Sequence, residues 1–374
     1  MTSESSPRGP ATGGLRSLLG AAVLAGALAL AACGSDGGTT DQATAPEAAA
    51  ADQPSTGTLR VFAYEDSVTP EMMDPYQEQN PDLNIKTATF DSDSEAAAKL
   101  AGGFEADVVE VCLDEAEPLL RRDLLRPLDT AGVTDWDQIA FHDSEGVKSD
   151  GQTIMVPLSA GPLGVLYNSE EVPEGIDSYA DLYDPRFAGN AAIEGDYALP
   201  AIAETALALG IEDPMNMDQE ELSKVSDYMD EHRAQFRSLW RSDSDLVNLF
   251  KSGEVVVSDG STAQAERMKQ AGLPVEWVEP TEGTISWVCG FGITSKAQNI
   301  QAAYRLINWQ ASPRAQAIRG KNGYVVTNPE ALPLVPDAQR KTADPSALDQ
   351  AIPETYPPIY DQWVRAFEQF QASG

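Results

Sequence analysis

Apolar positions in the first part of the chain's body come in short runs, separated by stretches of about ten residues with helical character. The runs at 59–64, 83–90 and 106–112 predict strands. The stretches at 70–79 and 94–101 predict helices. Because strands that alternate with helices form βαβ units, we expect this part to be an α/β lobe with a parallel sheet.

The pattern then starts a second α/β series. Two predicted strands, 153–158 and 164–168, flank a Ser-Ala-Gly-Pro segment at 159–162, which suits a chain that crosses between lobes. A stripe of apolar residues and one histidine, spaced by three or four, predicts one long helix; its members are Leu222, Val225, Met229, His232, Phe236 and Leu239. Further strands are predicted at 254–258 and 285–294, and further helices at 261–271, 298–310, 313–319 and 358–371.

The N-terminus has the pattern of an export signal. Arg8 and Arg16 precede a run of small and apolar residues at 17–32. At roughly sixteen residues, this run is shorter than the about 20 that a membrane-spanning helix needs. It ends in Leu-Ala-Ala-Cys, which resembles the lipobox read by lipoprotein signal peptidase. We therefore predict a signal peptide over 1–32 and lipidation of Cys33; the alternative is an apolar helix that happens to end in cysteine.

The segment after Cys33 consists mostly of small and polar residues and has no aromatic side chain up to residue 57. Such a composition cannot bury enough surface to order itself, so we predict a disordered tether over 33–57. One acyl chain anchors a protein weakly, whereas two anchor it durably. We therefore expect the mature protein to sit on the outer face of the cytoplasmic membrane, held there by its lipid anchor.

The net charge excludes one class of function, and the length of the chain indicates how many lobes it forms. The chain has 25 Lys and Arg against 59 Asp and Glu, a formal net charge of −34. Nucleic acid and anionic lipid surfaces would repel such a protein, which excludes DNA binding. From residue 58 onward about 317 residues remain, which is more than one typical hydrophobic core holds and enough for two lobes.

Two cysteines remain once Cys33 is lipidated, namely Cys112 and Cys289. An even pair in an exported protein makes a disulfide the leading hypothesis. In the chain-entropy model, closing a loop of this length stabilises a fold by as much as about 5 kcal/mol.

Several local segments in the body, none specific alone, follow one another in a recognisable order. They are the strand ending at Tyr64, the aspartate-valine strand at 107–112, Pro157, Tyr-Ala-Asp-Leu at 179–182 with Pro185 and Gly189, Gly-Glu-Val at 253–255, the segment EGTISWVCGFGI at 282–293, residues 303–308, and Gly323-Tyr324 with Asn328. This ordered set resembles the spermidine/putrescine-binding family of ABC-importer receptors, which have a type II periplasmic-binding fold. The likeness covers nearly the whole body.

The resemblance implies an α/β fold with two lobes joined by crossing hinge strands. Lobe one would comprise 58–161 and 288–332, and lobe two 162–287 and 333–374. In the family the lobes close on a small solute and deliver it to the permease subunits. We accordingly expect a monomeric receptor that binds a small cationic solute and has no catalytic activity, cofactor or metal.

A polyamine needs carboxylates for its ammonium groups and aromatic faces for its methylenes and for cation–π contact. By resemblance, the ligand-binding positions include Tyr64 with its neighbours Glu65 and Asp66, and also Asp196, Trp287 and Tyr324. The structural alternatives are lobe packing for the aromatic residues, solvated loop acids for Glu65 and Asp66, and a helix N-cap for Asp196.

The chain departs from the family at four positions. Cys289 stands where polyamine binders carry an aspartate, Leu199 replaces a glutamate, Asp114 replaces an aromatic residue, and Ser258, before Asp259, replaces a tryptophan. At least one carboxylate partner for ammonium is therefore missing. Either Asp114, Glu115 or Asp259 substitutes for it, or the ligand is a different amine or amino compound.

Other functions stay open at this point. The same receptor role could serve another small organic solute, such as an amino acid or a betaine. An enzyme would need Cys112 as a nucleophile, yet neither His142 nor His232 lies in a recognisable motif near it. A metal receptor is poorly supported, because the chain has only two histidines and they do not have the spacing of metal ligands. A sensory lipoprotein of the same fold cannot be separated from a transport receptor by sequence.

Overall fold

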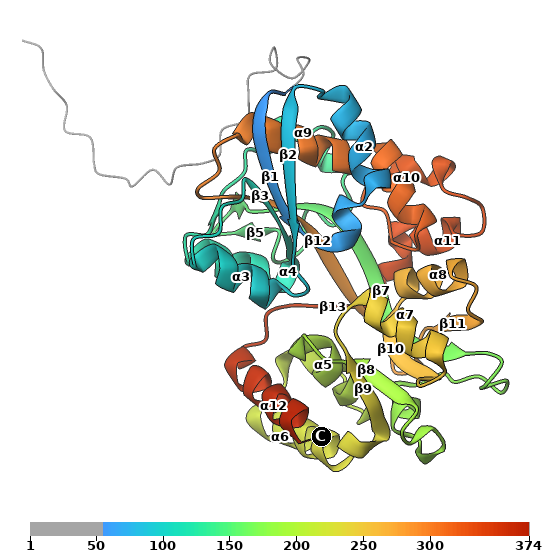
Figure 1. Ribbon diagram of the computed structural model, residues 1–374. Coiled ribbons are helices and arrows are strands. Elements are labelled where there is room, and N and C mark those ends of the chain that lie inside the picture. The colour runs from blue at the N-terminus through green and yellow to red at the C-terminus, as the bar shows by residue number, and fades with distance from the viewer. Residues whose placement is uncertain (1–54, 374) are drawn as a thin grey trace, which may run out of the picture. The chain divides into compact units, whose positions relative to one another are not determined.

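The computed structural model describes residues 55–373, which form a mixed sheet of eleven strands and the helices around it (Figure 1). The predicted signal peptide, nearly all of the predicted tether and Cys33 lie outside the described residues. Within residues 55–373, none of the helices has both the length and the apolar character needed to cross a bilayer.

The first lobe begins with the predicted βαβ units. Their elements are β1 (Gly57–Ala63), η1 (Glu65–Val68), α2 (Pro70–Gln79), β2 (Leu83–Thr89), α3 (Asp93–Ala101), β3 (Val108–Cys112) and α4 (Leu113–Arg121), followed by the short strands β4 (Leu125–Arg126), β5 (Lys148–Ser149) and β6 (Gln152–Thr153). β1 pairs in parallel with both β2 and β3, which confirms the predicted parallel sheet. Buried Leu59 and Val61 on β1 pack against Met72 and Tyr76 of α2, so the predicted apolar faces form the core.

Two long strands connect the lobes, β7 (Val156–Asn168) and β12 (Ile285–Thr294). They pair antiparallel with each other; β12 also pairs with β3, and β7 with β10 (Val257–Ser261) (Figure 1). The predicted interruption of β7 at 159–162 is wrong, because β12 pairs with it through Gly161 and Pro162. Proline lacks an N–H group and is tolerated where a strand edge has no pairing partner. On the side of β7 away from β12, Ala160 pairs with Val325 and the residues from Leu163 onward pair with β10, so Pro162 lies in the gap between these two partners.

The second lobe contains the second α/β series. Its elements are η4 (Tyr179–Tyr183), β8 (Ala191–Glu194), α5 (Ala198–Ala208), α6 (Gln219–Glu231), β9 (Phe236–Trp240), α7 (Asp243–Ser252), β10, α8 (Thr262–Gln270) and β11 (Val275–Val278). The single long helix predicted over 222–239 is wrong. α6 ends at Glu231, and Phe236 and Leu239 lie in β9, where they pair in parallel with β8.

The C-terminal elements divide between the lobes. They are α9 (Ile300–Ala311), α10 (Pro313–Lys321), η8 (Pro329–Leu334), α11 (Arg340–Ala343), η9 (Pro345–Leu348), β13 (Ile352–Pro353) and α12 (Tyr360–Ala372). Val335 and Ala343, expected in lobe two, pack with Val326 after α10, whereas Phe367 of α12 packs with the core of α5 and α6. β13 pairs with the first residues of β12. We propose that the chain passes into lobe two at β13 rather than at residue 333.

Candidate ligand-binding site

A cavity of about 230 Å³ lies between the lobes, and each lobe contributes the residues that follow its parallel strands. In the first lobe these residues follow β1, β2 and β3, and in the second they follow β8 and β9. Ser159 of β7 with Trp287 and Cys289 of β12 add lining from the crossing strands. Ligands of open α/β sheets bind at this end of the strands, where loops and helix N-termini present polar groups.

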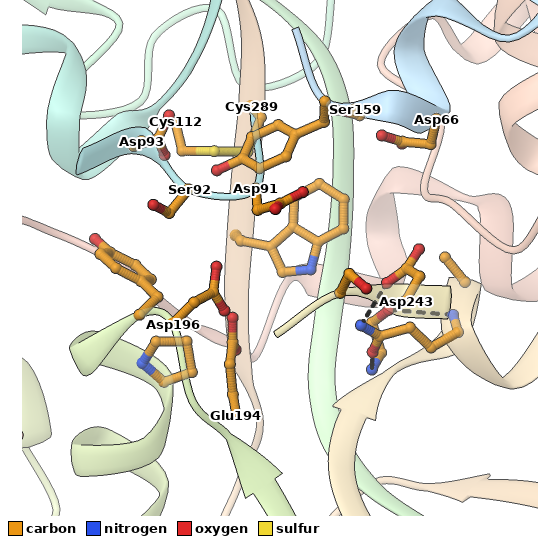
Figure 2. Close-up of a pocket in the computed structure, with 18 of the residues that line it drawn as sticks. Asp66, Asp91, Ser92, Asp93, Cys112, Ser159, Glu194, Asp196, Asp243 and Cys289 are labelled. Carbon is orange, nitrogen blue, oxygen red and sulfur yellow. Dashed lines mark hydrogen bonds between the residues drawn. A yellow bond between two sulfur atoms is a disulfide. The ribbon is translucent and has the colours of Figure 1, made fainter. Parts of the chain in front are cut away.

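Seven of the eight predicted ligand-binding residues line this cavity: Tyr64, Glu65, Asp66, Asp114, Asp196, Trp287 and Tyr324. They come from both lobes and from β12, so the tertiary structure brings together positions that lie far apart in the sequence. Figure 2 labels two of them, Asp66 and Asp196. Asp196 is not the N-cap of α5, because Tyr197 holds that position.

Asp259, the eighth residue, does not line the cavity. Its side chain is buried, with 1% of the residue exposed, and it accepts hydrogen bonds from Trp240 Nε1 at 2.7 Å and from the backbone N–H of Glu194 at 2.8 Å. Ser258 Oγ donates a third at 3.0 Å. Asp259 therefore fixes Trp240, which does line the cavity, and does not itself offer a carboxylate to a ligand.

Sequence reasoning missed several lining residues. They are Asp91, Asp93, Glu110, Glu194, Tyr197, Trp240, Arg241, Asp243, Arg267 and Glu354. Apart from Arg267 and Glu354, they lie within β3, β8 or β9 or up to four residues after β2, β8 or β9, and this place near a strand end was the available signal. Glu354 had none, since it enters the cavity only because β13 pairs with β12.

Glu110 supports the loop that carries Asp66. Its carboxylate accepts hydrogen bonds from the Tyr64 backbone N–H at 3.1 Å and from Ser67 Oγ at 2.8 Å. Burial, followed by repulsion from Asp66, raises the pKa of Glu110 to about 8.

Acidic side chains dominate the cavity. Ten Asp and Glu residues line it, against two arginines, Arg241 and Arg267. Burial, the largest cause, raises the pKa of Asp114 to about 7, and the adjacent Glu115 raises it further. Burial likewise raises the pKa of Asp196 to about 7. Within residues 55–373 the acidic side chains form no cluster placed to hold a metal ion.

Trp287 and Tyr324 give the cavity aromatic surface. Their rings meet edge to face, with centroids 5.9 Å apart. Gly161 makes room for the indole, because a Cβ at this position would lie 2.8 Å from Trp287 Cζ2. The glycine predicted to mark a break in β7 thus allows the tryptophan to pack against the strand.

The lobes touch across the cavity. The Tyr197 hydroxyl of the second lobe donates a hydrogen bond to the Asp114 carboxylate of the first. Nearby, Thr262 Oγ1 donates to the Gly323 carbonyl oxygen at 2.8 Å. A solute held between these contacts would touch both lobes at once.

The predicted disulfide between Cys112 and Cys289 is confirmed. The two residues are direct partners in the antiparallel pairing of β3 and β12, and both line the cavity. Cys112 therefore has no thiol to offer as the nucleophile that the enzyme hypothesis required.

A cavity between two α/β lobes, joined by crossing strands and lined at the strand ends, defines a two-lobed solute-binding protein. The comparison with protein families agrees, since residues 71–347 match the model described as "Bacterial extracellular solute-binding protein". The chain belongs to this family.

Individual relatives cover most of the chain. Spermidine/putrescine-binding periplasmic protein 1 of Haemophilus influenzae is 25% identical over 317 residues, which cover 83% of this chain and 84% of that protein. A putative spermidine/putrescine ABC transporter structure from Listeria monocytogenes has a TM-score of 0.75 at 20% identity and covers 84% of this chain and 99% of its own.

The PBP MotA from A. tumefaciens B6, solved in complex with glucopine, has a TM-score of 0.71 at 16% identity. It covers 84% of this chain and 100% of its own. These structural likenesses confirm the predicted two-lobed α/β fold.

Proposed function

We propose that the protein is the lipid-anchored receptor of an ABC importer and that it binds a small organic cation of the polyamine type between its lobes. The observation that carries this proposal is the excess of carboxylates in the cavity, ten against two arginines. The name of the H. influenzae relative, which is a spermidine/putrescine-binding protein, supports the same ligand class.

The chemistry of the lining suits an alkylammonium ion. Carboxylates form charge-assisted hydrogen bonds to ammonium groups, which offset the cost of removing the charge from water. The faces of Trp287, Tyr64 and Tyr324 offer cation–π contact and apolar surface for methylene groups. The protein supplies no reaction in this proposal; solute binding across the cavity stabilises the closed lobes, and the closed form presents the solute to the permease.

A second candidate is another small organic solute that carries an anionic or neutral group. Arg241 and Arg267 at the cavity favour it, as does the structural neighbour solved with glucopine. The balance of charge in the cavity makes this the weaker candidate.

Titration calorimetry and tryptophan fluorescence with putrescine, spermidine, betaine and basic amino acids test the proposal. We expect roughly micromolar binding of an amine, about 8 kcal/mol. Asp196→Ala should weaken it by about 2–5 kcal/mol, because a buried cation loses its partner. The matched variant Asp74→Ala, on the exposed face of α2, should bind like the wild type. Binding of only neutral or anionic solutes would refute the cationic ligand and leave the receptor role standing.

The membrane anchor has its own test. Because Cys33 is the proposed lipidation site, Cys33→Ala should be released from the membrane or left uncleaved. Metabolic labelling with palmitate, followed by membrane fractionation, measures this. Equal labelling of the wild type and the variant would contradict the anchor.

A further inference from the structure

Seven of the ten acidic groups that line the cavity form two sets that differ in their partners; Glu65, Asp91 and Glu110 belong to neither set. Figure 2 shows Asp93, Asp196 and Glu194 on one side of the cavity, and Asp66 and Asp243 on the other. We call the first set, together with Asp114 and Glu354, the open acidic end, and we call Asp66 and Asp243 with their arginine partners the paired end.

Three carboxylates of the open acidic end, Asp93, Asp114 and Glu354, are buried without a counter-charge. Asp93, Asp114 and Glu354 are 4%, 2% and 5% exposed, and each has one carboxylate oxygen without a hydrogen-bond partner. The charged groups that act most strongly on them are other carboxylates, and burial together with this repulsion raises the pKa of all three. Exposed Arg241 offsets only the neighbouring Asp196, and only in part.

Asp66 and Asp243 at the paired end already have guanidinium partners, and Glu65 is a third carboxylate that acts on Asp243 and Arg267. Arg267 Nη2 lies 3.2 Å from Asp243 Oδ2, and Gln264 Nε2 donates to Asp243 Oδ1 at 2.9 Å (Figure 2). Arg319 Nη1 lies 3.9 Å from Asp66 Oδ2. Arg319 is itself 2% exposed and is held by Ser67 Oγ at 3.0 Å.

An ammonium group gains little at the paired end. To bind Asp243 it would have to displace Arg267 or share the carboxylate with it, which places two cations side by side. A hydroxyl or amide group avoids this cost, because it can donate to the carboxylate and accept from the guanidinium.

We propose, on the basis of the receptor function above, that the site recognises positive charge at one end only. The ammonium group of the ligand lies at the open acidic end, and an uncharged polar group lies beside Asp243 and Arg267. The ligand class is therefore an amine that ends in a hydroxyl or amide group, rather than a symmetrical diamine.

Ligands matched in length test this with the full chain purified in detergent. Calorimetry compares putrescine with 4-amino-1-butanol, in which a hydroxyl replaces one ammonium group, and with N-acetylputrescine. We expect at least one of the two singly charged amines to bind within tenfold of putrescine or more tightly. Binding of both that is more than tenfold weaker would show that charge is read at both ends and would overturn the proposal. Binding of spermidine without binding of any of these three amines would also overturn the proposal. If no amine binds, spermidine and the basic amino acids included, the cationic-ligand function itself fails.

A substitution gives an independent measure. Arg267→Gln frees the Asp243 carboxylate, so the affinity ratio of putrescine to 4-amino-1-butanol should rise at least tenfold. Arg237→Gln is the matched control, since Arg237 forms an exposed pair with Glu254 outside the cavity lining and should leave the ratio unchanged. An unchanged affinity ratio in a folded Arg267→Gln variant would overturn the proposal that charge is recognised at one end only. If this variant does not fold, the comparison of the three ligands on the wild-type protein tests the proposal instead.

Discussion

Lowering the pH should weaken binding of a small amine, because the cavity carboxyls hold protons in the free protein. The pKa values of Asp114 and Asp196 are both raised to about 7. A bound ammonium group favours the carboxylate form, so binding lowers these pKa values and releases protons. Affinity must therefore rise with pH through the region around 7 and level off above it.

The magnitude follows from the ionised fractions. For a pKa of about 7, the ionised fraction falls roughly 25-fold between pH 7.5 and pH 5.5. Affinity should drop about 25-fold if one of the two carboxylates must be ionised in the complex, and about 600-fold if both must be. An alkylammonium group has a pKa near 10, as lysine does, so the ligand stays charged throughout.

Calorimetry at several pH values, in pairs of buffers with different ionisation enthalpies, measures both the affinity and the protons released. At pH 6.5 about 1.5 protons should leave if both groups participate. Asp196→Asn removes one titrating group and should lower this to about 0.75. An affinity that is the same at pH 5.5 and pH 7.5, with no buffer-dependent heat, would show that these carboxyls do not face the ligand.

Three further outcomes are expected. Asp259→Ala should lower the free energy of unfolding by about 2–4 kcal/mol in urea titrations, because three donors, two of them in buried hydrogen bonds, lose their acceptor. A variant as stable as the wild type but impaired in binding would instead assign Asp259 to the ligand. Replacing both Cys112 and Cys289 by alanine should cost as much as about 5 kcal/mol in the same assay, and no loss would contradict a stabilising crosslink. Gly161→Ala should push against the ring of Trp287 at a cost of about 1–3 kcal/mol, and an unchanged tryptophan emission would show that the ring does not need this space.

Local patterns in the sequence determined most of the elements. The apolar runs gave β1 and β2 within one or two residues, and the helix predicted at 70–79 and the strand predicted at 285–294 match α2 and β12. Such elements follow from contacts between near neighbours in the chain, which a periodic pattern records.

The same patterns failed where a distant partner decides the conformation. Phe236 and Leu239 continue the helical spacing of α6, but pairing with β8 draws them into β9. The segment at Gly161 and Pro162 looks like a break, yet pairing with β12 keeps β7 continuous. In both cases long-range hydrogen bonds override local preference.

The site shows the same division. Residue types and their order along the chain indicated an exported receptor with acidic and aromatic positions, and seven of the eight chosen residues line the cavity. Only the tertiary structure decided that Asp259 supports Trp240, that Glu354 enters the cavity, and that Asp243 already has an arginine partner. A residue's type shows what it can bind, whereas strand register and burial decide what it faces, because both depend on segments far away in the chain.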